Sequence, residues 1–163
     1  MSTRPNGSAD PSDRPRRVVV LGSTGSIGVN TLEVVTHLRE QGQPFEVVGL
    51  AAGNNVDRLI EQARTHQPEA VAIADARHRD QLEAGLPAGT AIYTGPDAAL
   101  ELTRALDATD LIAAVVGSAG LPATLAAIEK GWRIGLANKE TLVAAGALVV
   151  PLLSKHGAKL LPV

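Results

Sequence analysis

Residues 18–28 read Val-Val-Val-Leu-Gly-Ser-Thr-Gly-Ser-Ile-Gly, and this segment sets the expectation for the whole fold. An unbroken apolar, β-branched run is typical of a strand buried on both faces of a parallel sheet. The run ends at Gly22, and a helical pattern begins at Ile27. A glycine-rich turn between a first strand and a first helix is where many proteins of this class bind the diphosphate of a dinucleotide.

Three glycines divide the work of that turn. We expect Gly22 to permit the tight turn, Gly25 to let the backbone approach a diphosphate, and Gly28 to let the first helix pack closely on the strand. The phosphates are then expected at the positive end of the helix dipole, against the amides of Thr24, Gly25, Ser26 and Ile27. The spacing is G-x-x-G-x-x-G rather than G-x-G-x-x-G, so a glycine-rich turn without a ligand is the alternative.

The rest of the chain alternates short apolar strands with helices. After the first strand, further strands are expected at residues 45–51, 70–74, 91–93, 111–116, 132–137 and 158–163. Helices are expected at residues 27–40, 55–66, 76–84, 122–130 and 139–150, with another starting at Pro96 and with Pro151 bending or interrupting the last. This alternation predicts an α/β fold, a doubly wound parallel sheet of about six strands.

Length and composition predict one globular domain and exclude several classes of protein. Of the 163 residues, 1–15 are expected to form a disordered tail and 16–163 a nucleotide-binding domain. A net charge of −2 argues against a nucleic-acid binder. The sequence has no Cys, which excludes disulfides and thiolate chemistry. It has no apolar run of about 18 residues and no signal-peptide pattern, so we expect a soluble, cytoplasmic chain that does not enter membranes.

The end of the second strand bears on the choice between NAD and NADP. An NAD site usually has an Asp or Glu there, which binds the ribose 2′-hydroxyl. Here the strand ends in Gly53-Asn54-Asn55, and neutral amides can donate hydrogen bonds to a 2′-phosphate, with Arg58 adding a cation. We therefore expect NADP. The same residues also suit a turn followed by a helix cap, and the two roles are compatible.

Two later strand ends also carry unusual residues. The segment Gly117-Ser118-Ala119-Gly120 leaves room for a nicotinamide ring or ribose, and a flexible turn is an equal alternative. In the segment 138–140, Lys139 can reach a substrate phosphate or carbonyl oxygen. Asn138 can bind a ribose or an amide, and Glu140 can bind a ribose hydroxyl. The alternative for that segment is the polar start of a helix. No catalytic or metal role is assigned to the four His residues.

Together these segments resemble the 1-deoxy-D-xylulose 5-phosphate reductoisomerase family. The resemblance runs from Arg17 to the last residue and is carried by residues 20–28, 52–55, 136–140 and 160–163. It implies a Rossmann-like NAD(P)-binding domain, NADPH as coenzyme, a divalent cation (Mg²⁺ or Mn²⁺), a sugar-phosphate substrate and a homodimer. The family converts 1-deoxy-D-xylulose 5-phosphate to 2-C-methyl-D-erythritol 4-phosphate in non-mevalonate isoprenoid biosynthesis.

The resemblance also implies roles for individual residues. Coenzyme contacts fall on Thr24, Gly25, Ser26, Ile27, Gly53, Asn54, Asn55, Asn138 and Glu140, and the substrate contact falls on Lys139. The family often has a basic residue where Asn54 stands, so we expect a weaker hold on the 2′-phosphate here.

The family's metal-binding Asp-Ser-Glu follows the segment that closes this sequence at Val163. We therefore expect an NADPH-binding fragment without metal ligands, inactive alone, which aggregates or dimerises through uncovered apolar surface. A non-enzymatic NADP(H)-binding module is the alternative.

Overall fold

The computed structural model describes residues 14–163, apart from the side chains of Lys139, Thr141, Leu142 and Ala144. Residues 1–13 of the predicted disordered tail therefore lie outside the described residues. Seven strands form a single sheet in the order β4-β3-β2-β1-β5-β6-β7, and all neighbouring strands run parallel. This confirms the predicted doubly wound sheet, and each strand range expected from the sequence overlaps one of the seven strands.

The elements follow the predicted alternation closely. The strands are β1 (Arg16–Leu21), β2 (Phe45–Ala52), β3 (Ala70–Ile73), β4 (Ala91–Thr94), β5 (Asp110–Ala113), β6 (Arg133–Leu136) and β7 (Lys159–Pro162). The helices are α1 (Ser26–Glu40), α2 (Val56–His66), the 3₁₀ turn η2 (Ala76–His78), α3 (Arg79–Gly85), α4 (Ala98–Ala105), α5 (Leu121–Glu129) and α6 (Lys139–His156). None of these helices is both long enough and apolar enough to cross a membrane.

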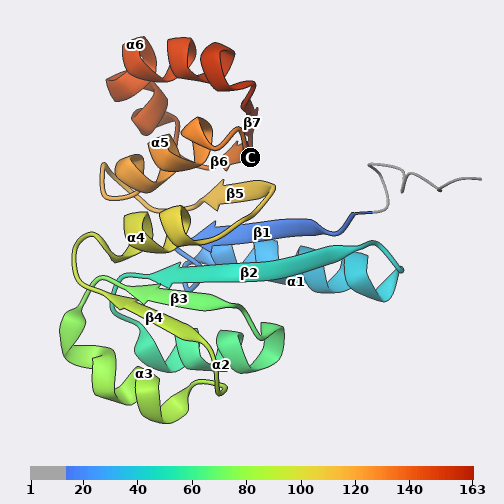
Figure 1. Ribbon diagram of the computed structural model, residues 1–163, viewed down its shortest axis with the longest axis vertical. Coiled ribbons are helices and arrows are strands. Elements are labelled where there is room, and N and C mark those ends of the chain that lie inside the picture. The colour runs from blue at the N-terminus through green and yellow to red at the C-terminus, as the bar shows by residue number, and fades with distance from the viewer. Residues whose placement is uncertain (1–13) are drawn as a thin grey trace, which may run out of the picture.

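Helices cover the sheet on both faces, as Figure 1 shows. Val18 and Val20 of β1 pack with α1, α2 and α3 on one face, whereas Val19 and Leu21 pack with α4, α5 and α6 on the other. All four are at most 3% exposed. Burying an aliphatic side chain this completely contributes about 1.5–3 kcal/mol, so the unbroken apolar run of β1 is what a strand between two helix layers requires.

Several boundaries differ from those expected, and three of these differences have a clear physical meaning. Strand β5 ends at Ala113 rather than at 116, and Val116 is exposed in the following loop. The helix predicted to begin at Pro96 begins at Ala98. Helix α6 is not interrupted at Pro151 but continues to His156. Pro151 is exposed, while Leu152 and Leu153 pack on the core, so packing offsets the hydrogen bond that proline cannot donate.

One face of the sheet is covered by helices only in part. Helices α1, α2 and α3 pack on β1 to β4, and within the described residues no helix covers the same face of β5, β6 and β7. A cavity of about 370 Å³ opens there, lined mainly by apolar side chains such as Ile27, Val34, Ile112 and Val163. Val34 is 57% and Val163 70% exposed.

We expect the 163-residue chain to self-associate through this apolar face, because solvent-exposed apolar patches favour association. Light scattering over a range of protein concentrations measures the effect. Replacing both Val34 and Val163 with Lys is expected to lower the average mass. A monomeric mass for the unmodified chain at every concentration would contradict this expectation.

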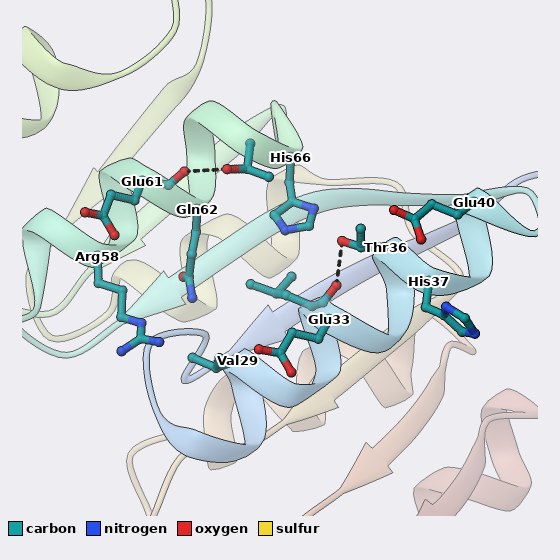
Figure 2. Close-up of a pocket in the computed structure, with 11 residues that line it drawn as sticks. Val29, Glu33, Thr36, His37, Glu40, Arg58, Glu61, Gln62 and His66 are labelled. Carbon is teal, nitrogen blue, oxygen red and sulfur yellow. Dashed lines mark hydrogen bonds between the residues drawn. The ribbon is translucent and has the colours of Figure 1, made fainter.

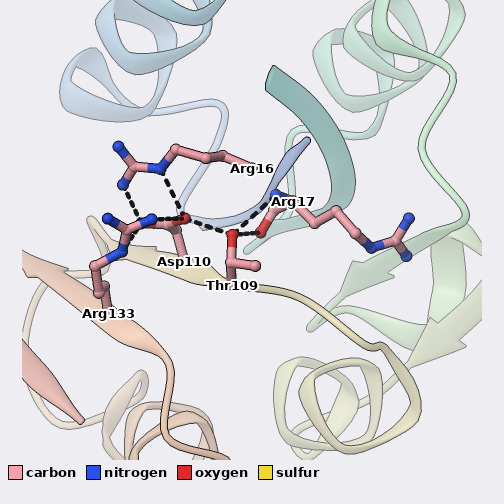
Figure 3. A network of polar contacts seen from close by, with 5 residues as sticks. All are labelled: Arg16, Arg17, Thr109, Asp110 and Arg133. Carbon is pink, nitrogen blue, oxygen red and sulfur yellow. Dashed lines mark hydrogen bonds and ion pairs between the residues drawn. The ribbon is translucent and has the colours of Figure 1, made fainter. Parts of the chain in front are cut away.

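At the edge of the sheet where the strands begin, a buried carboxylate links neighbouring strands. Asp110 receives ion pairs from Arg16, the first residue of β1, and Arg133, the first residue of β6 (Figure 3). The Thr109 hydroxyl also donates to the Asp110 carboxylate, at 2.6 Å. Asp110 thus joins the first residues of three adjacent strands, far from the strand ends that the glycine-rich turn follows.

Replacing Asp110 with Asn is expected to destabilise the fold by about 1–2 kcal/mol, because charge-assisted hydrogen bonds to a buried group are lost while the two arginines stay partly solvated. Urea unfolding measures the change. The matched control is Asp107→Asn, since Asp107 is exposed and accepts its hydrogen bond from Arg17 through the backbone oxygen and not through the carboxylate. Equal unfolding midpoints for the two variants would show that the carboxylate of Asp110 is dispensable.

Candidate functional site at the carboxyl edge of the sheet

In a parallel sheet the carboxyl ends of all strands lie at one edge, and ligands bind where the strand order reverses. Here the reversal lies between β1 and β5. A cleft of about 110 Å³ opens at that point. Its lining includes the turn after β1 (Gly22), the loop after β2 (Gly53) and the loop after β5 (Val115, Ala119 and Gly120), together with residues of β3 and the start of α4. The structure therefore brings three of the four predicted segments to one cleft.

The backbone of the glycine-rich turn leaves no room for side chains at two positions. Gly22 has a φ of +76°, and a Cβ there would stand 2.6 Å from the Ala114 carbonyl oxygen. A Cβ at Gly28 would collide with the carbonyl oxygen of Gly22 and the backbone of Ser23. Gly28 thus packs α1 against the turn itself rather than against the strand. Gly25 is different, since the nearest atom to a Cβ there is 3.5 Å away, so the protein alone would accept a side chain.

The amides of this turn divide into paired and unpaired groups. The amides of Gly22 and Ser23 both donate to the Ala51 carbonyl, at 2.8 and 2.9 Å. Gly25 is the N-cap of α1 and offers no side-chain cap. Within residues 14–163, no backbone acceptor is found for the amides of Ser26 and Ile27 in the exposed first turn of α1. Donors at the positive end of a helix suit an anion such as a phosphate.

The loop after β2 forms a turn followed by a helix cap, which was the alternative interpretation of Gly53-Asn54-Asn55. The Asn55 side chain accepts from the Arg58 amide at 3.2 Å and caps α2. Gly53, Asn54 and Asn55 are all exposed. Capping occupies the side-chain oxygen of Asn55 but leaves its amide donor free for a second role.

Arg58 does not point to the Gly53 loop. It lines a larger open cavity of about 420 Å³ between α1 and α2, together with Val29 and Glu33. Figure 2 shows Arg58 and Gln62 extending from α2 toward the start of α1. The cation that we expected beside the 2′-phosphate therefore lines the cavity between α1 and α2.

A different arginine, which the sequence analysis did not identify, lies next to the Gly53 loop. The Asp75 amide donates to the Gly53 carbonyl at 3.2 Å, which places the turn after β3 beside that loop. Arg77 donates to the Asp75 carboxylate through Nε and through Nη2, the latter at 2.6 Å. These hydrogen bonds lower the pKa of Asp75 to about 2. An Asp two residues before an Arg, just after a predicted strand, was the available signal.

The segment after β6 stands apart from the cleft. The Asn138 side chain accepts from the Glu140 amide at 2.9 Å and caps α6, which agrees with the alternative of a polar helix start. Glu140 is exposed. The side chain of Lys139 lies outside the described part of the structure. The segment 138–140 lies at the same carboxyl edge as the glycine-rich turn, but β5 lies between β1 and β6, the strands that precede them. None of the residues 138–140 lines the cleft.

Among the described residues, no group of three or more His, Asp or Glu side chains is placed to hold a metal ion.

The sheet order, the tight turn and the cleft at the reversal point define an α/β domain of the Rossmann type. The family model for 1-deoxy-D-xylulose 5-phosphate reductoisomerase matches residues 18–146. The chain belongs to this family, which confirms the resemblance seen in the sequence.

Individual relatives agree with that assignment. A Synechococcus protein named 1-deoxy-D-xylulose 5-phosphate reductoisomerase is 49% identical over 150 residues. The match covers 90% of this chain and 37% of the relative, so the chain spans a little over a third of the length of that relative. An Anaeromyxobacter protein of the same name is 45% identical over 148 residues, covering 91% of this chain and 37% of the relative.

Solved structures show the same fold. The Zymomonas mobilis reductoisomerase in complex with NADPH has a TM-score of 0.84 and 39% identity, covering 91% of this chain and 39% of that one. A second reductoisomerase structure, in complex with NADPH, fosmidomycin and magnesium, has a TM-score of 0.78 and 36% identity. It matches 90% of this chain and 36% of its own length.

Replacing Arg77 with Ala is expected to raise the pKa of Asp75 from about 2 toward its ordinary 3.8, because the Arg77 side chain is the main cause of the lowering. A lowered carboxyl pKa favours the folded state above the ordinary pKa, and this is lost as the pH falls toward 2. NMR titration of the Asp75 carboxyl carbon measures the shift.

The matched control is Arg79→Ala, because Arg79 is paired with Glu83 at 2.8 Å instead. An Asp75 pKa that stays near 2 in the Arg77 variant would show that the ion pair is not its cause.

Proposed function

We propose that this chain is the NADPH-binding part of a 1-deoxy-D-xylulose 5-phosphate reductoisomerase. The whole enzyme converts 1-deoxy-D-xylulose 5-phosphate to 2-C-methyl-D-erythritol 4-phosphate. The observation that carries the proposal is the exposed first turn of α1, with unpaired amides beside a loop that has no carboxylate at its tip. Membership of the family supplies the choice of coenzyme, since the solved relatives bind NADPH.

The coenzyme extends along the carboxyl edge in this proposal. Its diphosphate lies against Thr24, Gly25, Ser26 and Ile27, where backbone amides and the helix dipole oppose its charge. Its 2′-phosphate lies at Gly53, Asn54 and Asn55, which can donate amide hydrogen bonds to it. Asn138 and Glu140, at the end of β6, contact the nicotinamide half, and Lys139 contacts the sugar phosphate.

The chemistry of the whole enzyme needs more than these residues. NADPH supplies a hydride when bound, and the part described here binds and orients it. The metal seen in the solved relatives is assigned to no residue of this chain, because the described side chains offer no suitable ligand set. No catalytic residue is proposed here. The whole protein is proposed to be a cytoplasmic homodimer, and the apolar face beside β7 supports association.

A charged residue at Gly25 tests the proposal, because Gly25→Asp changes the ligand site without straining the fold. Gly25 has φ −77° and ψ 170°, the geometry of a helix N-cap, and Asp is a preferred N-cap residue. The variant is therefore expected to unfold at an equal or higher urea concentration. Its carboxylate would stand where the diphosphate lies, so NADPH affinity is expected to fall by about tenfold or more.

Titration of nicotinamide fluorescence measures both coenzymes on the wild-type chain. NADPH is expected to bind about tenfold more tightly than NADH, as a charge-assisted contact to the 2′-phosphate implies. The control variant is Asn30→Asp, which adds the same charge to an exposed position of α1 beyond the turn. Undiminished NADPH binding by Gly25→Asp would overturn the proposed site.

A further inference from the structure

We infer that Gln62 is a positioning residue that holds the diphosphate turn and the 2′-phosphate loop at a fixed spacing. This inference rests on the proposed function and adds a residue outside the predicted contact set. Gln62 lies on α2, in the second turn of that helix, and touches neither predicted phosphate position directly.

The contact that carries the inference is a hydrogen bond from α2 to the turn. Gln62 Nε2 donates to the Ser23 carbonyl oxygen at 2.7 Å, between residues 39 apart in the sequence. Both residues are buried, with Ser23 at 0% and Gln62 at 9% exposure. No backbone donor to the Ser23 carbonyl is found within residues 14–163, so the carboxamide is what satisfies it.

Ser23 is thereby held from both sides by one structural unit. Its amide donates to Ala51 at the end of β2, and its carbonyl accepts from Gln62 on α2. Between Ala51 and Gln62 the chain forms the Gly53-Asn54-Asn55 loop, capped onto α2 by Asn55. The turn that would bind the diphosphate and the loop that would bind the 2′-phosphate are therefore two ends of one rigid piece.

A fixed spacing matters because the diphosphate and the 2′-phosphate of NADP are both attached to the adenosine ribose, which sets the distance between them. A protein that holds both binding elements in place before the ligand arrives avoids the ordering cost on binding. Without the Gln62 contact the turn keeps its glycines and amides but loses its tie to α2.

The unsatisfied atoms around this contact argue against a plain packing role. Gln62 Oε1 and Ser23 Oγ are both buried, and neither has a hydrogen-bond partner within residues 14–163. Each such atom costs stability, so an apolar side chain of similar size would suit this interior better if packing were its only purpose. The donor on Nε2 is what an apolar side chain cannot supply.

The first test replaces Gln62 with Met, which keeps the volume but removes the donor, and measures binding by calorimetry. NADP⁺ affinity is expected to fall by about tenfold, the equivalent of 1.4 kcal/mol. Affinity for adenosine 2′-monophosphate, which reaches only the 2′-phosphate loop, is expected to stay within about twofold of wild type. The matched control is Gln81→Met, because Gln81 also donates to α2, at Asp57 (2.6 Å), but lies away from the turn.

A second variant covers the case in which Gln62→Met fails to fold. In Gln62→Glu the carboxyl group can donate to the Ser23 carbonyl only when protonated, and burial favours that form. NADP⁺ affinity relative to wild type is therefore expected to recover as the pH is lowered from 8 to about 5. The titratable and charged groups around the cavity are Glu33, His37, Glu40, Arg58, Glu61 and His66. They are present in both proteins, so their direct effects on binding cancel in the ratio, and what remains is the titration of the carboxyl at position 62 under their influence.

The outcomes separate this inference from the function on which it rests. Wild-type binding of NADP⁺ with unchanged binding by Gln62→Met would overturn the role of Gln62 and leave the proposed function standing. If Gln62→Met lost affinity equally for NADP⁺ and adenosine 2′-monophosphate, Gln62 would have a structural role only. The same would follow if the NADP⁺ affinity of Gln62→Glu relative to wild type did not vary with pH. Failure of the wild-type chain itself to bind NADP⁺ would refute the proposed function and this inference with it.

Discussion

The close approach of α1 to the turn after β1 is the constraint on which the site depends. A Cβ at Gly28 would strike the Gly22 carbonyl and the Ser23 backbone, so only glycine lets the helix begin where it does. This fixes the direction of α1 and therefore the direction of its unpaired amides. The same approach sets the Ser23 carbonyl where Gln62 can reach it. The absence of a side chain at Gly28 therefore positions both the unpaired amides of α1 and the Ser23 carbonyl that accepts from Gln62.

Local patterns predicted the fold well because each βαβ unit is built from neighbouring residues. The β-branched run at 18–21, the glycines that follow and the helix stops are all short-range signals. These local signals failed where tertiary packing decides at which residue a strand or helix ends. Residues 114–116 are as apolar as the strand before them, yet the strand ends at Ala113. Pro151 should break a helix by its own chemistry, but the leucines after it keep α6 on the core.

Contacts between distant residues could not be predicted, because they depend on the order of the strands in the sheet. No local pattern around Arg16 points to its partner, but β5 lies next to β1 and brings Asp110 to it across 94 residues. The Gln62 contact to Ser23 is of the same kind. The motifs of the candidate site were visible in the sequence, whereas the buried side chains that hold them in place were not.

The charge balance at the Gly53 loop indicates how neighbouring loops would act together in the proposed 2′-phosphate site. Asp75 lies beside this loop, and an unpaired carboxylate there would repel a 2′-phosphate. Arg77 cancels that charge with two of its donor groups, and because its side chain is 89% exposed its remaining donors face solvent at the same edge. The loop tip itself carries only the neutral Asn54, so the Asp75–Arg77 pair of the turn after β3 contributes the charges next to the proposed 2′-phosphate position.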